Sequence, residues 1–162
     1  MRLLLLRHGI AEDAGPDTGW HDEPRRLTAE GVARMEGEGR GMAALAIRAD
    51  AILTSPLIRC VQTAALVAAA IGGVPRVDAR LRPGMDLDLV EDILLQHPDA
   101  ASVLLCGHQP DLSHLVAELT GGARVEFRKG TLAVLDLAAA RPRGARLRAL
   151  YPPATLRLLG GL

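Results

Sequence analysis

Short apolar runs separated by longer amphipathic stretches dominate the pattern of this chain of 162 residues. Apolar runs within the segments 2–7, 51–54 and 102–106 predict buried strands there, because the runs lack the alternation of a half-exposed strand. Between the first two runs, apolar residues recur at helical spacing from Val32 to Leu45. They predict a helix from an N-cap at Thr28 to about Ile47, although its several glycines should weaken it.

The rest of the chain continues to alternate strands with helices and then becomes richer in strands. Ser55 is expected to cap a helix that has Pro56 at its first position and ends near Ile71. Further helices are expected at 88–96 and 110–120, with strands near Val77 and at 131–137 and 146–151. This order predicts an α/β fold, a three-layer α/β/α sandwich with a mostly parallel central sheet. With no repeat or linker, residues 1–162 are predicted to form one domain.

Composition narrows the function classes. The 19 basic and 19 acidic residues cancel, so no overall field favours nucleic acid or an anionic membrane as a partner. No apolar segment approaches the roughly 20 residues of a membrane span, and the N-terminal leucines do not make a signal peptide. Cys60 and Cys106 form no disulfide framework, which fits a reducing cytoplasm. Each thiol is either a buried inert side chain or a regulatory one.

Basic residues follow the ends of the three apolar runs. Arg7, His8 and Gly9 come after the first run, Arg59 follows the second, and His108 follows the third. Parallel strands bring their carboxyl ends to one edge of a sheet, where open α/β sheets bind ligands. Arginine forks can hold phosphate oxygens in pairs, and an imidazole can act as base or nucleophile. An anion site for a phosphate is therefore expected at this edge.

Neighbouring residues extend this candidate site. The absence of a side chain at Gly9 should let a phosphate approach, and the backbone N–H groups of Gly107 and Gln109 lie next to His108 in the sequence. Asp22 is a candidate for orienting an arginine. Paired histidines are also common metal ligands, but flanking arginines oppose a cation and no carboxylate accompanies them. We therefore expect neither a metal nor a cofactor.

The segments Arg7-His8-Gly9, Ser55-Pro56-Leu57-Ile58-Arg59 and Gly107-His108 together resemble the histidine phosphatase superfamily, which has the phosphoglycerate-mutase-like fold. The resemblance covers almost the whole chain in order. The small size of the chain points to the short branch of the family, which contains bacterial phosphohistidine phosphatases. The resemblance implies that His8 is the phosphorylated nucleophile, and that Arg7, Arg59 and His108 complete the phosphate pocket. Arg25, in the segment Arg25-Arg26-Leu27-Thr28, is implied as a further phosphate contact.

One departure from the family affects the expected substrate. Mutase-like members carry a glutamate as general acid after the third strand, where this chain has Leu81-Arg82-Pro83-Gly84-Met85-Asp86. Asp86 is the candidate replacement. Without an acid, alkoxides leave poorly, whereas a phosphoramidate such as phosphohistidine can be protonated on its own nitrogen.

These observations predict a metal-independent phosphatase that acts through a phosphorylated His8 and removes phosphate from phosphohistidine on a signalling protein. A small-molecule phosphomonoesterase using the same residues is the first alternative. A catalytically silent module that binds phosphoproteins is the second, although binding alone would not require a nucleophile. Trapping of acid-labile phosphate on His8 would separate an enzyme from a binding module.

Overall fold

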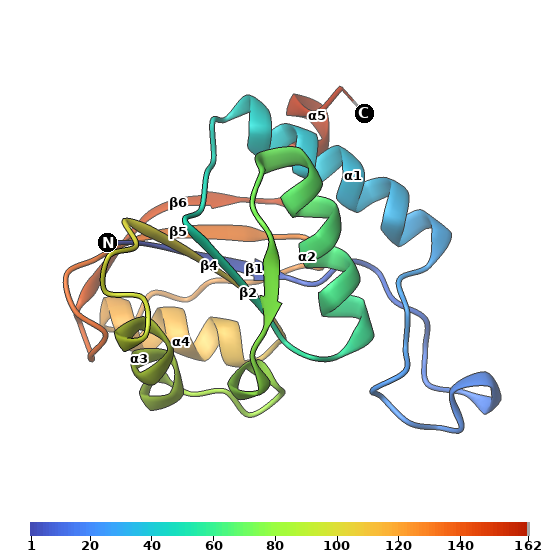
Figure 1. The fold of residues 1–162 in the computed structure, drawn as a ribbon, viewed down its shortest axis with the longest axis horizontal. Coiled ribbons are helices and arrows are strands. Elements are labelled where there is room, and N and C mark those ends of the chain that lie inside the picture. Colours follow the sequence, from blue (N-terminus) through green and yellow to red (C-terminus); the bar gives the residue numbers. More distant parts are fainter. Residues whose placement is uncertain (162) are drawn as a thin grey trace.

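The computed structural model describes residues 1–161, and a mixed six-stranded sheet lies at its centre (Figure 1). The strands lie in the order β3-β2-β4-β1-β5-β6. The first four are parallel, and β5 runs antiparallel to both β1 and β6. The strand bounds are β1 Arg2–Arg7, β2 Ala51–Thr54, β3 Pro75–Val77, β4 Ser102–Gly107, β5 Leu132–Leu137 and β6 Ala145–Tyr151.

Helices cover both faces of the sheet and so confirm the predicted α/β sandwich. One face is covered by α1 (Ala29–Ala44), α2 (Ile58–Ile71) and α5 (Pro153–Leu159), and the other by α3 (Leu87–Leu95) and α4 (Asp111–Thr120) (Figure 1). Short 3-10 turns lie at Pro16–Thr18 and Ala79–Leu81.

The consecutive leucines of β1 connect the two cores. Leu3 and Leu5 pack in the core beneath α3 and α4, while Leu4 and Leu6 pack in the core beneath α1 and α2. All four are fully buried. Side chains alternate between the faces of a strand, so a central strand covered by helices on both sides needs apolar residues at every position.

Strand register brings the candidate residues to one edge of the sheet. Arg7 pairs with Gly107, and Thr54 pairs with Cys106. The segments that follow β1, β2 and β4 therefore begin side by side, as the order of the apolar runs predicts.

One local prediction is wrong, and one helix was not predicted. Ser55 does not cap α2, which begins at Ile58 with Leu57 as its N-cap. The C-terminal helix α5 has no counterpart in the predicted elements. This helix packs closely on α1 at Gly41. A Cβ at Gly41 would collide with the carbonyl oxygen of Leu156, so the close approach requires glycine there. At least one glycine of α1 thus serves a close helix approach that offsets its low helix propensity.

Candidate active site

A pocket of about 300 Å³ lies at the carboxyl edge of the parallel strands. It collects residues from the β1 end, the loop before α1, the α2 start, the β4 end and the loop before β5. Its lining is Arg7, His8, Asp22, Arg25, Arg59, Pro83, His108, Gln109 and Lys129. All of these except Pro83 and Lys129 were expected from the sequence as site candidates or possible orienting groups.

The backbone fixes the tautomer of His8, and burial keeps its ring neutral. Its Nδ1 lies 2.8 Å from the carbonyl oxygen of Gly9. A carbonyl only accepts hydrogen bonds, so Nδ1 carries a proton, and because Arg59 donates to Nε2, that nitrogen keeps its lone pair. Burial, opposed in part by the bond to Gly9 and reinforced by nearby Arg59, lowers the pKa of His8 to about 3. A neutral imidazole with an unprotonated Nε2 is the form that can attack phosphorus.

Arg59 connects the other groups of the pocket. This buried side chain donates from Nε to Nε2 of His8 at 3.3 Å, and its Nη2 lies 3.3 Å from Nδ1 of His108. Nη1 donates to the backbone carbonyl of Asp22 at 2.9 Å, and Nη2 also donates to the Asp22 carboxylate at 2.8 Å. A single guanidinium therefore contacts both histidines and an acidic residue.

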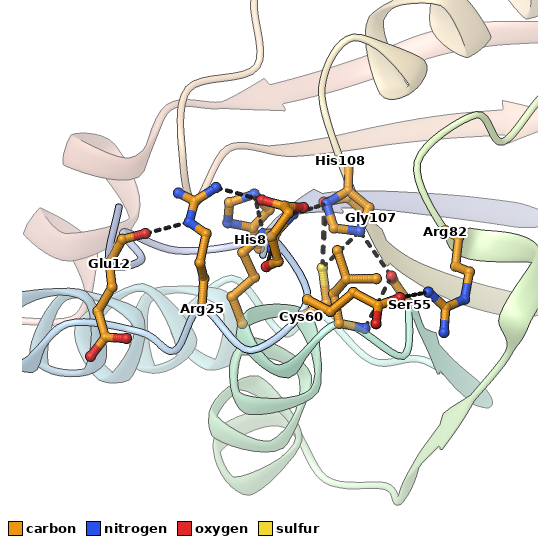
Figure 2. Close-up of polar contacts among 12 residues, drawn as sticks. His8, Glu12, Arg25, Ser55, Cys60, Arg82, Gly107 and His108 are labelled. Atoms are coloured by element: carbon orange, nitrogen blue, oxygen red, sulfur yellow. Dashed lines mark hydrogen bonds and ion pairs between the residues drawn. The ribbon is translucent and has the colours of Figure 1, made fainter. Parts of the chain in front are cut away.

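His108 is held from the side opposite Arg59. Its Nε2 lies 2.8 Å from the hydroxyl of Ser55, and Figure 2 shows Ser55 and Cys60 beside the imidazole. Because Arg59 can only donate, Nδ1 of His108 accepts and Nε2 carries the proton toward Ser55. The buried Ser55 thus orients a site histidine rather than starting a helix.

Cys60 lies beneath His108, with its Sγ 3.5 Å from Nε2 of the imidazole. Burial alone would raise the pKa of the Cys60 thiol, but hydrogen bonds from Cys106 and His108 lower it below its usual value. Both cysteines are free and fully buried. Their burial favours the interpretation that they are inert packing groups.

Arg7 and Lys129 come together through the loop that precedes β5. Nη1 of Arg7 donates to the carbonyl of Phe127 at 2.6 Å, and the backbone N–H of Gly130 donates to the carbonyl of Arg7 at 3.1 Å. This pairing places Lys129 at the pocket wall. The position of Lys129 depends on a contact between distant parts of the chain, so the local sequence gave little sign of it.

Asp22 and Arg25 lie in the long loop before α1. Asp22 accepts from Nη1 of Arg25 at 2.7 Å and from Nη2 of Arg59 at 2.8 Å. Burial would raise the pKa of Asp22, but hydrogen bonds from Arg59 and Arg25 outweigh it and lower that pKa. The only carboxylate among the lining residues is therefore held in its ionised form.

Gly9 and Gln109 have local roles that differ from the expected ones. A Cβ at Gly9 would meet Cγ of Met35 at 2.6 Å, so the missing side chain makes room for α1 and not for a ligand. The N–H of Gly9 donates to Thr63 at 3.0 Å. Gln109 lines the pocket, and its side chain is bonded to Ser113.

The structure does not support Asp86 as an acid in the pocket. Its carboxylate caps α3 by accepting from the N–H of Leu89 at 3.0 Å, and the side chain is exposed outside the pocket lining. A carboxylate after Gly84 is an ordinary N-cap, which explains why the sequence alone did not reveal its direction.

A larger cavity of about 940 Å³ lies at the opposite edge of the sheet, near Arg2 and Ser102. Its lining contains no histidine or cysteine. The smaller pocket, where histidines and arginines converge, is therefore the candidate active site. In residues 1–161, no three histidine, cysteine or acidic side chains form a metal-binding group. Within the same residues, no helix combines the length and apolarity needed to cross a membrane.

An open α/β sheet with arginines and histidines at its carboxyl edge is suited to binding a phosphate group. The chain belongs to the histidine phosphatase superfamily (branch 1), whose family model matches residues 3–83. It is 31% identical over 126 residues to the phosphohistidine phosphatase SixA of Escherichia coli. The matched segment covers 75% of this chain and 76% of that protein. It is also 36% identical over 148 residues to an uncharacterised protein of Picosynechococcus, covering 87% of this chain and 88% of that one.

Comparison with solved structures gives the same family. The structure of the protein histidine phosphatase SixA complexed with tungstate matches with a TM-score of 0.82 and 26% sequence identity. The match covers 96% of this chain and 99% of that one. The phosphoglycerate-mutase-like fold expected from the sequence is thus confirmed over nearly the full length.

Proposed function

We propose that this member of the histidine phosphatase superfamily removes phosphate from phosphohistidine on a protein, through a covalent intermediate on His8. One observation carries the proposal: the neutral His8 presents an unprotonated Nε2 to a pocket that contains three arginines. Such a pocket combines a nucleophile with charge for a phosphoryl group.

The first chemical step forms a bond between Nε2 of His8 and phosphorus. The bond from phosphorus to the leaving group breaks in line, and its electron pair goes to the leaving group. Arg59 donates to Nε2 before attack, so its guanidinium is placed to follow the negative charge onto the phosphoryl oxygens. Water then attacks the phosphorylated His8, releasing inorganic phosphate and the neutral imidazole.

The carboxylates near the pocket favour a nitrogen leaving group. Asp22 is held ionised by Arg59 and Arg25, and Asp86 caps α3 outside the pocket. Neither is placed to give a proton to an alkoxide, which departs poorly without one. An imidazole leaving group takes up its own proton, so phosphohistidine fits this pocket better than an alkyl phosphate. The similarity to SixA, named as a phosphohistidine phosphatase, supports the same substrate.

The positive charge that phosphoryl transfer requires is supplied by side chains. Arg7, Arg25, Arg59 and Lys129 all line the pocket, whereas Asp22 is its single acidic residue. We therefore propose that the reaction needs no metal ion. Full activity after exhaustive chelation supports this, and activity lost to EDTA and restored by a divalent cation contradicts it.

A phosphorylated protein substrate separates this proposal from its alternatives. The protein is offered a phosphohistidine-bearing protein, a sugar phosphate and an aryl phosphate, and phosphate release is measured for each. We expect the phosphohistidine protein to give the highest kcat/KM, and acid-labile phosphate to be trapped on His8. Faster turnover of the sugar phosphate would favour the small-molecule esterase. Binding without turnover or trapping would favour the binding module.

A further inference from the structure

The carboxylate of Asp22 lies where two of the three arginines of the pocket, Arg59 and Arg25, converge. One oxygen lies 2.8 Å from Nη2 of Arg59, and the other lies 2.7 Å from Nη1 of Arg25. Figure 2 shows Arg25 approaching the pocket from the side of His8. A planar anion thus bridges two guanidinium groups that sequence analysis assigned to phosphate.

Arg59 has only one N–H group to spare while this contact persists, the second one on Nη1. Its Nε donates to His8, Nη1 to the carbonyl of Asp22, and Nη2 to the carboxylate of Asp22 with His108 nearby. Only departure of Asp22 frees the Nη1 and Nη2 donors together. A phosphoryl group therefore cannot obtain a bidentate contact from Arg59 in this arrangement.

We propose that Asp22 is an internal competitor for the anion site formed by Arg59 and Arg25. A phosphoryl group must displace the Asp22 carboxylate in order to bind there. This inference rests on the proposed function, because it takes Arg59 and Arg25 as ligands of the phosphoryl group. Asp22 then determines specificity: a dianionic phosphoryl group can replace a single carboxylate charge, while a monoanion competes poorly with a tethered carboxylate.

The loop that carries Asp22 has few contacts that would hold it in place. None of the residues 12–26 is buried, so little apolar surface holds this loop to the body. Its base is fixed by the bridge between Ala11 and Leu27 and by a bond from Gln62 to the N–H of Leu27. The tip extends away from the sheet (Figure 1), and the Asp22 contacts and an ion pair of Glu23 with Arg82 tie it back.

The Asp22 carboxylate can exchange with a phosphoryl group because water and solutes reach it. The Asp22 side chain is 50% exposed, although its partner Arg59 is only 4% exposed. A half-exposed ion pair is typically weak, and an incoming phosphoryl group supplies equivalent acceptors. The displaced carboxylate would move into water with its loop, without opening the apolar core.

Binding of inorganic phosphate tests this inference without relying on turnover. Phosphate and acetate are titrated by calorimetry into the wild type, Asp22→Asn, and the control Asp17→Asn. Asp17 is an exposed residue of the same loop, outside the pocket lining. Thermal unfolding of each variant checks that the fold is retained.

We expect Asp22→Asn to bind phosphate more tightly than the wild type by about three- to thirty-fold, the range for losing one or two exposed ion pairs. Its KM for an aryl phosphate should fall in parallel. Asp17→Asn should match the wild type, and acetate should bind measurably only to Asp22→Asn.

An unchanged or weaker affinity of folded Asp22→Asn for phosphate would overturn the inference, because a residue that merely positions Arg59 would give that result. Failure of the proposed function looks different: phosphate would bind to both proteins, but no phosphate would be trapped on His8. Absence of phosphate binding in both folded proteins would show that Arg59 and Arg25 do not form an anion site, and would overturn the inference.

Discussion

Nε of Arg59 lies 3.3 Å from Nε2 of His8, the one ring nitrogen that the Gly9 carbonyl leaves unprotonated. The nucleophile therefore faces a fixed positive charge before any substrate arrives. Because Arg59 is buried at the start of α2, this charge is shielded from water and acts more strongly than a surface arginine would.

Replacement of Arg59 should mainly slow the chemical step. Lysine at this position keeps the charge but loses the planar fork that contacts both histidines. We expect Arg59→Lys to lower kcat by roughly 10²–10³, the scale for removing a donor that stabilises the transition state. Steady-state kinetics on an aryl phosphate measures this, with the exposed Arg40→Lys on α1 as control. Equal kcat values for both variants would remove Arg59 from the chemistry.

Removal of the His8 imidazole should abolish covalent phosphorylation while the protein stays folded. His8→Asn deletes Nε2 but leaves a polar group near Gly9. Rapid quenching with labelled substrate should find acid-labile phosphate on the wild type and on His97→Asn, whose imidazole follows α3 away from the pocket. Labelled phosphate of the same stoichiometry on His8→Asn would mean that another side chain is the nucleophile.

The depressed pKa of His8 predicts an unusual pH dependence. Burial lowers this pKa from 6.5 to about 3, so the neutral nucleophile persists well below neutral pH. Titration of the His8 ring by NMR in phosphate-free protein should show no protonation near 6.5. The unfolded chain does take up that proton, so His8 contributes stability above about pH 6.5 that is lost as pH falls toward 3. A His8 midpoint near 6.5 would contradict this environment.

Glu38 should influence stability in the opposite direction. It is buried between α1 and α5, where Arg157 binds one carboxylate oxygen at 2.7 Å and the other has no partner in residues 1–161. Burial, opposed by Arg157, raises its pKa from 4.5 to about 7. Its contribution is fully present below about pH 4.5 and is lost as pH rises through 7.

We therefore expect the stability of Glu38→Gln relative to the wild type to increase from about pH 5 to about pH 8, since the amide carries no charge to desolvate. Urea unfolding at the two pH values measures the change. Glu36→Gln, an exposed neighbour on α1, should show no such trend. The same difference in unfolding free energy at both pH values for Glu38→Gln would refute the assignment.

Sequence patterns predicted the parts of this molecule that depend on local order. The apolar runs predicted the central strands, and the order of strands and helices predicted that Arg7, Arg59 and His108 would meet. These inferences needed only strand polarity and the position of each side chain after its strand. The family resemblance added the expected roles.

Features that depend on tertiary contacts were not predictable in the same way. Helix α5 spans only seven residues and starts beside two prolines, so it offers little helical periodicity. Ser55 followed a common capping pattern, but its contact with His108 arises from the meeting of β2 and β4. The positions of Asp22 and Lys129 depend on how loops fold back over the sheet edge.

The leaving group should control the rate, because within residues 1–161 the one carboxyl group that lines the pocket, that of Asp22, is ionised. Phosphoramidates and aryl phosphates should react readily, whereas alkyl phosphates should react far more slowly, since an unprotonated alkoxide leaves poorly. Measuring phosphoenzyme formation with esters of graded leaving-group pKa should give a steep dependence in the wild type. Asp86→Asn should keep both the slope and the stability, because asparagine caps helices about as well as aspartate. A flat wild-type dependence that turns steep in Asp86→Asn would identify Asp86 as the acid. It would require α3 to release its N-cap during turnover, and it would favour a phosphate ester of a metabolite over phosphohistidine.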